Sequence, residues 1–400
     1  MNPSPKETNL PNWTTKLTLL LLSSLVVMSG AGLSSSLPLI EDHFASTPNA
    51  GFWVRMLQTT PALFILITAP LAGGLIDRIG RKRLIVAGAL LYGLAGTSGF
   101  FIRSLWGLLA GRALLGVSVA AIYTTTTALV SDYFQGLSRN RFLGLQSGFM
   151  AISGFLFQPL GGVLADIQWH FSFLIYTAGI LILPLIFLFI YEPGGKTNPT
   201  GPATSGGRLF QQIPTMPLIA IFLLTFLGQT IFYVTPVQLP FYLNRINIQS
   251  ARVIALFTGT ISLMMGISGL SYGRMRKRLS YKKMVLLSFG LMAGGYLIVG
   301  ASQRYGLIIL GIVISGFGLG MNNPNLVSWL ISLAPEEMRG RALGARLTFN
   351  YLGQFMSPIL AQPLIAAGGV PSAYLAAAGL GALVVIVGLV LVGVRNESKA

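Results

Sequence analysis

The chain has 400 residues, of which 53% are hydrophobic and only 9% are charged. This composition leaves too little polar surface to cover a soluble core of that size, so the sequence predicts an all-α integral membrane protein. The net charge of +17 could indicate a nucleic-acid partner, but the basic residues lie between hydrophobic runs rather than on a soluble module, so we expect none. No cysteine is present, which excludes disulfides and thiolate metal sites.

Hydrophobic runs follow one another along the whole chain. Each approaches the length of about 20 residues that a helix needs to cross about 30 Å of hydrocarbon, and backbone amides inside a bilayer need internal partners. The first run is too long for a signal peptide and lacks a small-residue cleavage site, so we interpret it as a retained span. The sequence predicts twelve transmembrane helices, at about residues 17–40, 52–75, 84–102, 105–131, 142–165, 171–191, 216–243, 252–273, 284–302, 305–333, 342–366 and 372–394.

The two halves of the chain are related by an offset of about 200 residues. The matching residues are Gly73, Arg78 and Lys82 with Gly273, Arg278 and Lys282, Arg141 and Gly144 with Arg341 and Gly344, and Gly116 with Gly316. A stretch rich in Gly, Pro, Thr and Ser separates the halves. We therefore expect two pseudo-symmetric six-helix bundles, at residues 1–191 and 216–400, joined by a cytoplasmic linker at 192–215.

The basic residues fix the expected orientation in the membrane. Most of the 27 Lys and Arg residues fall in alternate loops, while a few, Arg55 among them, fall on the other side. Because basic residues accumulate on the cytoplasmic side, we place both termini in the cytoplasm. The sequence predicts a multi-pass protein of the plasma membrane, the bacterial inner membrane, with the lipid bilayer as its partner.

A run of charge and glycine lies between the second and third predicted spans. It consists of Gly73, Asp77, Arg78, Gly80, Arg81 and Lys82 in the pattern G-x-x-x-D-R-x-G-R-K. Such a run indicates a tight turn at a membrane surface, where Gly80 permits a backbone that other residues avoid. In the fourth span, Arg112 and Gly116 form the pattern R-x-x-x-G.

These motifs resemble the major facilitator superfamily, and the resemblance covers essentially the whole chain. The closest pattern is that of its twelve-helix drug:proton antiporters. The resemblance implies that Asp77 caps the start of the eleventh helix and that Arg81 bridges to Asp132, which would hold the halves together on the cytoplasmic face and favour an outward-open state. The alternative is that these charges only fix the topology.

The fifth span carries a second motif of that family. Gly154, Pro159 and Gly162 are similar to the G-x-x-x-G-P-x-x-G-G run of its proton-coupled exporters, although Gln158 replaces the glycine before the proline. The match favours export of drugs or metabolites. The alternative is that glycine and proline here only allow close packing and a bend.

Charged groups deep in a membrane are candidates for function because they are costly. None of the ten acids is predicted near the bilayer centre. Asp42, beside His43, is the remaining candidate for proton coupling, with a plain interfacial acid as the alternative. The deepest predicted charges are Arg112, a candidate for coupling or substrate contact, and Arg346; each needs backbone carbonyls, an acid or an anionic substrate, and Arg346 could instead reach the cytoplasmic surface.

Uncharged polar residues concentrate in the second half and could line a central cavity. Gln229 and Tyr233 are four residues apart and so share one helix face. Asn322 to Asn325 include a proline and are predicted to break the tenth helix. The full set of cavity candidates is Arg112, Gln229, Tyr233, Gln238, Asn322, Asn323, Asn325, Arg346, Asn350 and Gln354.

No catalytic or metal-binding motif is found, so we expect neither an enzyme nor a cofactor. The sequence predicts a secondary transporter, a monomer, that exports small amphipathic compounds such as drugs by proton antiport and alternating access. One alternative is a transporter of organic anions or lipid-like molecules without proton coupling. A second alternative is a non-transporting membrane receptor built on the same fold.

Overall fold

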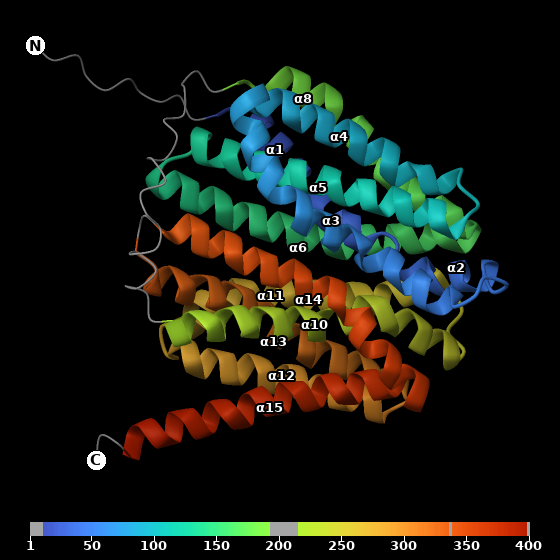
Figure 1. Ribbon diagram of the computed structural model, residues 1–400, viewed down its shortest axis with the longest axis vertical. Helices are drawn as coiled ribbons and strands as arrows, with labels where there is room; N and C mark the ends of the chain where they lie inside the picture. The colour runs from blue at the N-terminus through green and yellow to red at the C-terminus, as the bar shows by residue number, and fades with distance from the viewer. Residues whose placement is uncertain (1–10, 193–214, 336–337, 398–400) are drawn as a thin grey trace, which may run out of the picture.

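The computed structural model describes residues 11–192, 215–335 and 338–397; for Asp77, Asn140 and residues 391–397 only the backbone is described. Throughout this part of the chain the regular structure is helical (Figure 1). The first half contains α1 (Trp13–Ala31), η1 (Ser34–Ser36), α2 (Leu37–His43), α3 (Ala50–Ile79), α4 (Arg81–Thr97), η2 (Ser98–Phe100), α5 (Leu105–Tyr133), α6 (Gly136–Ile167), η3 (Trp169–Thr177), α7 (Ala178–Leu181) and α8 (Leu183–Phe189). The second contains α10 (Thr215–Arg245), α11 (Ala251–Arg276), α12 (Tyr281–Ala301), α13 (Tyr305–Leu333), α14 (Arg339–Gly368) and α15 (Val370–Glu397).

The all-α membrane fold predicted from the sequence is confirmed. Eleven segments of the described chain are long and apolar enough to cross a membrane, with α1 to α2 forming the first and η3 to α8 the sixth. The remaining predicted span, the eleventh in chain order, is α14, which runs through the same bundle over 30 residues. Arg339, Arg341 and Arg346, together with its amide side chains, lower its hydropathy, so α14 is not among those eleven segments.

The helices form two groups that reflect the predicted duplication. Helices α1 to α8 lie together in the upper part of Figure 1 and α10 to α15 in the lower part. Helices α5 and α13 have the same length of 29 residues. In α5 a β-carbon on Gly116 would lie 2.5 Å from the Pro61 carbonyl oxygen, and in α13 one on Gly316 would lie 2.9 Å from Met264 Cβ, so the matched glycines allow the same close approach to α3 and α11. The domain boundaries remain a prediction, because the linker lies outside the described residues apart from Glu192 and Thr215.

Polar side chains inside the spans bond to the backbone of their own helices. Thr18, Ser23 and Thr60 each donate a hydroxyl hydrogen bond to the carbonyl four residues earlier, which satisfies a hydroxyl where no water reaches. Serine side chains accept from the first turns of α5, α11 and α12 at Ser104, Ser250 and Ser280, as N-caps do.

The prediction that Asn322 to Asn325 break the tenth span was wrong. Helix α13 continues through Pro324 from Tyr305 to Leu333. A proline removes one backbone hydrogen bond, but within a membrane bundle the neighbouring helices and polar side chains compensate for that loss. The polar face of α13 is therefore presented by a continuous helix.

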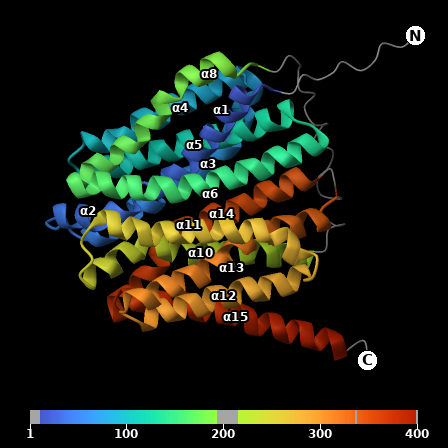
Figure 2. The ribbon, with the colours of Figure 1, turned by 180° about the vertical axis from the view of Figure 1, so that it is seen from behind.

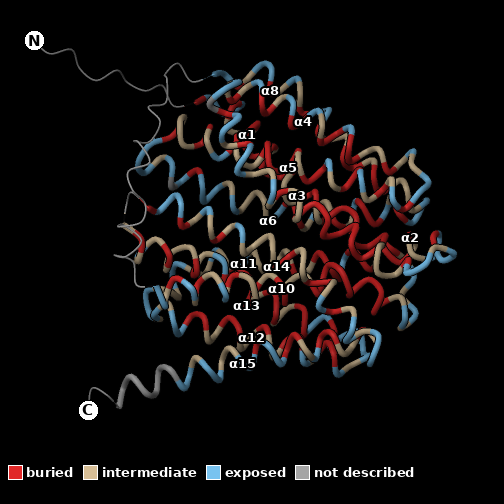
Figure 3. Tube along the Cα trace, viewed as in Figure 1, coloured by how far each residue is buried: buried red, intermediate tan, exposed pale blue. Residues whose placement is uncertain are grey.

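The two groups of helices meet along two pairs, α3 with α14 (Figure 1) and α6 with α11 (Figure 2). We call the end of the molecule that holds Trp13, Gly80 and Arg339 the basic end, and the end that holds α2 and Ala251 the opposite end. Residues 136–148 of α6 and 339–345 of α14, at the basic end, are mostly exposed or half-buried. Figure 3 shows that buried segments are more frequent toward α2, so packing is tighter at the opposite end.

Candidate functional site

A small cavity lies within the second half, between α10, α13, α14 and α11. Its volume is about 30 Å³, room for about two water molecules. It is lined by Thr225, Gly228, Gln229, Phe232, Met265, Leu319, Asn322, Asn323, Leu326 and Arg346. Four of the predicted cavity residues, Gln229, Asn322, Asn323 and Arg346, are thus brought together.

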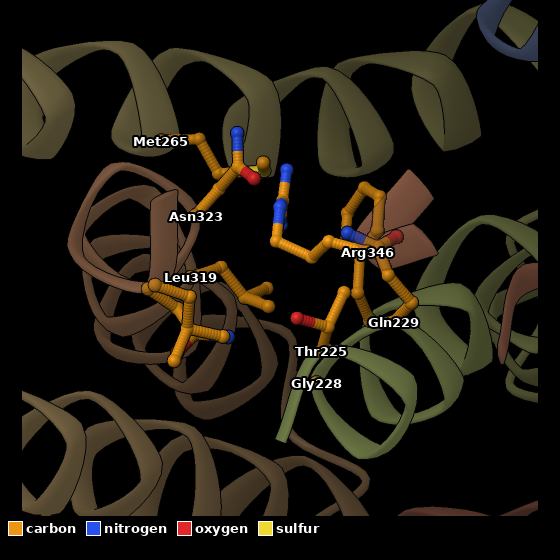
Figure 4. A pocket seen from close by; sticks show the side chains of 10 residues that line it. Thr225, Gly228, Gln229, Met265, Leu319, Asn323 and Arg346 are labelled. Atoms are coloured by element: carbon orange, nitrogen blue, oxygen red, sulfur yellow. The ribbon is translucent and has the colours of Figure 1, made fainter. Parts of the chain in front are cut away.

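Arg346 is the only charged residue among those that line this cavity. Its side chain reaches into the space bounded by Thr225, Leu319 and Asn323 (Figure 4). The residue is only 5% exposed, its Nε is buried without a partner, and it makes neither a hydrogen bond nor an ion pair with any described residue. The alternative that Arg346 reaches the membrane surface does not hold in this conformation.

Three tyrosines lie around Arg346. Tyr123 of α5 and Tyr351 of α14 are its electrostatic neighbours, and Tyr351 also interacts with Tyr233 of α10. Because Tyr123 belongs to the first half and the others to the second, this cluster lies where the halves meet. The Tyr233 hydroxyl also reaches the first half, 3.6 Å from the position that a β-carbon on Gly30 would take.

The remaining predicted cavity residues lie elsewhere. Gln238 is fully buried at the opposite end, where it accepts a hydrogen bond from Arg55. Asn325 is also fully buried and donates to the Tyr281 carbonyl at 3.0 Å, so it faces α12. Asn350 is half-buried and Gln354 is buried, both on α14. The cavity prediction was therefore wrong for Gln238 and Asn325, because the rotation of each helix turns them toward other partners.

Arg112 is enclosed within the first half and does not line the cavity. It is 1% exposed. Its Nε donates to the Leu57 carbonyl, Nη1 to the Tyr176 hydroxyl and Nη2 to the Ser29 carbonyl, each at 2.8 Å. Backbone carbonyls, one of the partners considered for this residue, therefore hold Arg112, and the prediction of an open substrate contact is corrected for this conformation.

Contacts between the two halves concentrate at the opposite end. Arg55, which the sequence placed on the side away from the cytoplasm, is 6% exposed; its Nε donates to Gln238 Oε1 at 2.9 Å and its guanidinium lies 3.9 Å from the Phe241 ring centroid. Arg55 also lies 3.5 Å from a Glu41 carboxylate oxygen. The sequence did not indicate this link, because an arginine near a predicted helix end is typical of a solvated position.

The motif of the fifth span belongs to the same region. In α6 a β-carbon on Gly162 would lie 2.6 Å from the Ala251 carbonyl oxygen of α11. Asp166, one turn further, accepts hydrogen bonds from the backbone nitrogens of Ala251 and Arg252 and from the Ser250 hydroxyl. Gly154 packs near Val27 and Ser262, and Pro159 lies within α6. The motif therefore places α6 directly against α11 of the other half.

Asp42 lies at the opposite end of the molecule, in the last turn of α2, and is exposed. For Asp42 as a candidate for proton coupling, we expected a carboxylate partly shielded from water, with a plain interfacial acid as the alternative. The exposure of Asp42 corrects that expectation for this conformation.

At the basic end, Arg81 and Asp132 are in contact, with Arg81 Nε 2.5 Å from Asp132 Oδ2. This pair joins α4 to α5 within the first half, so it does not itself hold the halves together as expected. Gly80 has a φ of 87°, which makes the tight turn between α3 and α4. The Glu192 carboxylate accepts from the backbone nitrogens of Arg81 and Lys82, each at 2.8 Å, and so caps α4.

The other residues of that motif take no part in these contacts. Gly73 has no atom within 4 Å of the position of a β-carbon, and Arg78 is exposed. The side chain of Asp77 lies outside the described residues, so its predicted capping of α14 stays a prediction.

Two helical groups that meet along α3 with α14 and α6 with α11, with tight contacts at one end and a small polar cavity within the second group, define a membrane transporter with two halves. The sequence profile of the Major Facilitator Superfamily matches residues 19–270 and 221–400. The chain belongs to this superfamily, which confirms the resemblance found in the sequence. The protein is a transporter of this superfamily and not an enzyme.

Among curated relatives, the multidrug resistance protein MdtG of Klebsiella pneumoniae is 25% identical over 387 residues, which cover 92% of this chain and 91% of the relative. Among solved structures, a mutant of the nucleoside transporter NupG matches with a TM-score of 0.77 and 11% identity, covering 94% of this chain and 99% of that chain. The human organic anion transporter MFSD10 (TETRAN) matches with a TM-score of 0.68 and 18% identity, covering 96% of this chain and 100% of the other. These structures share the fold.

Proposed function

We propose that the protein exports small amphipathic compounds, including drugs, across the membrane in exchange for protons. The observation that carries this proposal is the asymmetric packing of the two halves. Arg55, Gly162 and Asp166 join them at the opposite end, whereas the facing segments of α6 and α14 are loosely packed at the basic end. If the protein alternates between this arrangement and one that is tight at the basic end and loose at the opposite end, a substrate site between the ends becomes accessible from each side of the membrane in turn.

The lining of the cavity around Arg346 supports an amphipathic substrate. Its polar groups are amides, a hydroxyl and one guanidinium, and the rest of the lining is apolar, with Phe232, Met265 and Leu319. Mobile thioether and aromatic side chains suit ligands of varied shape. The relative named a multidrug resistance protein is consistent with such substrates.

The proposed orientation places the basic end and both termini in the cytoplasm of a bacterial cell, with the protein a monomer in the inner membrane. In this orientation the arrangement described above is closed on the outside. The basic residues Arg78, Arg81 and Lys82 then lie on the side where such residues accumulate.

The proposal is tested in proteoliposomes that hold an imposed pH gradient, challenged with lipophilic cations, neutral drugs and organic anions in turn. We expect one class to collapse the gradient in a protein-dependent manner, and the responding class identifies the substrate. The variant Asp42→Asn tests whether that carboxylate takes part in coupling. Absence of collapse with every compound, together with gradient-independent flux of one of them, would refute proton antiport.

The variant Asp77→Asn is expected to transport more slowly than the wild type while its abundance in the membrane stays the same. The reason is that the loss of the carboxylate charge weakens the proposed cap on the start of α14. Initial rates of uptake into inside-out vesicles, normalised to the amount of protein, measure the effect. Lys277→Asn at the matching position of the second half is the control, and a wild-type rate for Asp77→Asn would exclude a gating role.

A further inference from the structure

Arg346 carries a fixed positive charge that the described protein does not neutralise. The residue is only 5% exposed, and its Nε is buried with no hydrogen-bond acceptor among the described residues. A buried charge without a partner is costly, and such a residue inside a membrane marks a functional site by default. Arg112 provides the contrast within the same chain, since three acceptors hold it.

The groups around Arg346 are those that bind a small anion. Gln229 and Asn323 offer two amides that can donate hydrogen bonds, whereas the Thr225 hydroxyl already donates to the Ile221 carbonyl; no acid among the described residues lines the cavity. The hydroxyls of Tyr123, Tyr233 and Tyr351 make no hydrogen bond to a described residue, and their side chains interact electrostatically with one another and with Arg346. Hydrogen bonds to an anion from a guanidinium and hydroxyls are stronger than neutral ones.

The size and charge of the site favour a carboxylate. The cavity has a volume of about 30 Å³, space for about two water molecules and hence for the two oxygens of a carboxylate. Arg346 contributes one positive charge, which a monoanion neutralises, whereas a phosphate dianion would leave negative charge in a site with no second cation. A guanidinium also matches a carboxylate in a two-point geometry.

We infer that Arg346 anchors an anionic subsite, and that the substrates of the proposed exporter are amphipathic monocarboxylates. The carboxylate binds Arg346, and the apolar body of the substrate lies toward Phe232, Met265 and the tyrosines where the halves meet. The claim that these compounds are transported rests on the proposed function, whereas the claim that Arg346 binds a carboxylate does not. A lipophilic cation would be repelled by Arg346, because no acid of the cavity offsets its charge.

The pairing also explains how a charged arginine can move with the protein through the transport cycle. A guanidinium paired with a carboxylate carries no net charge, so the occupied site is less costly in a low-dielectric environment than the empty one. Occupation of the subsite therefore favours the closed intermediates through which alternating access passes. An anion is also driven outward by a membrane potential that is negative inside.

The test uses three probes with the same apolar body, namely 2-naphthylacetate, 2-naphthylacetamide and 2-naphthylmethylamine. Binding to the purified full-length protein is measured by calorimetry. We expect the wild type to bind the acid at least tenfold more tightly than the amide and to bind the amine least. In Arg346→Gln, affinity for the acid is expected to fall about tenfold to that of the amide, while affinity for the amide is unchanged.

Arg139→Gln is the matched control, because it removes the same charge from an exposed position of α6 at the basic end. It is expected to leave all three affinities unchanged. Arg346→Lys, which keeps the charge but loses the planar geometry, is expected to bind the acid with intermediate affinity. Thermal stability of each variant verifies that it is folded.

Equal affinity of wild type and Arg346→Gln for the acid, or preference of the wild type for the amine, would overturn the inference. Flux of the acid in proteoliposomes separates the two proposals. Binding that depends on Arg346 without flux would refute the proposed function and leave the subsite intact. Flux of cations or neutral compounds that is unaffected in Arg346→Gln would support export and refute the subsite.

Discussion

Replacement of Arg112 by leucine is expected to destabilise the first half severely. The substitution removes three hydrogen bonds, to Leu57, Tyr176 and Ser29, in a site that is 1% exposed. Because a hydrogen bond from a charged group contributes about 1.5–3 kcal/mol and its acceptors remain buried, we expect a loss on the order of 3 kcal/mol or more. For a unit of this size, about 3 kcal/mol corresponds to a fall in Tm of about 6–12 °C.

The matched comparison is Arg346→Leu. Both substitutions remove a buried arginine from the same protein, but Arg346 has no hydrogen bond or ion pair to lose among the described residues. Its replacement by an apolar side chain is therefore expected to leave the Tm unchanged or to raise it. Thermal unfolding in detergent, followed by the loss of the monodisperse peak on gel filtration, measures both. Equal Tm values for the two variants would contradict the different roles assigned to these arginines.

Replacement of Gly162 by valine is expected to abolish transport while the protein still inserts and folds. A β-carbon at this position would lie 2.6 Å from the Ala251 carbonyl and 2.7 Å from Ala255 Cβ. Because both contacts are too short, the backbones of α6 and α11 must separate to accommodate the valine. The variant is therefore expected to remain open at the opposite end. Gly144→Val is the control on the same helix, since nothing lies within 4 Å of that position.

Conformation is read from the reactivity of a single thiol, because the chain contains no cysteine. Ser34 is a suitable position for the introduced cysteine, since it is 1% exposed and its hydroxyl donates to the Pro236 carbonyl of the other half. We expect a membrane-impermeant maleimide to label Ser34→Cys at least tenfold faster with Gly162→Val than with Gly144→Val. Equal rates in the two backgrounds would show that Gly162 does not control closure.

The number and position of the helices could be predicted from the sequence because the bilayer leaves the backbone few choices. The offset of 200 residues likewise predicted the duplication, which α5 and α13 confirm. The same constraint explains the error at Pro324: turn residues break helices in water, whereas in a packed membrane bundle the helix continues.

Side-chain partners were harder to predict because they depend on the rotation and crossing of helices far apart in the sequence. Gln238 and Gln229 are both glutamines of α10, yet one bonds to Arg55 and the other lines the cavity. Arg112 and Arg346 could not be distinguished from the sequence, since either could have had carbonyls or an anion as its partner. The capping of α11 by Asp166 joins residues 85 positions apart and leaves no local signal.

Alternating access of the two halves is tested most directly by distances between spin labels attached to introduced cysteines. One pair, Ser46→Cys with Gln303→Cys, spans the halves at the opposite end, and the other, Gln135→Cys with Lys277→Cys, spans them at the basic end; all four positions are exposed. The account predicts that a transported compound lengthens the first distance as it shortens the second. Distances that stay fixed, or that change in the same direction at both ends, would contradict it.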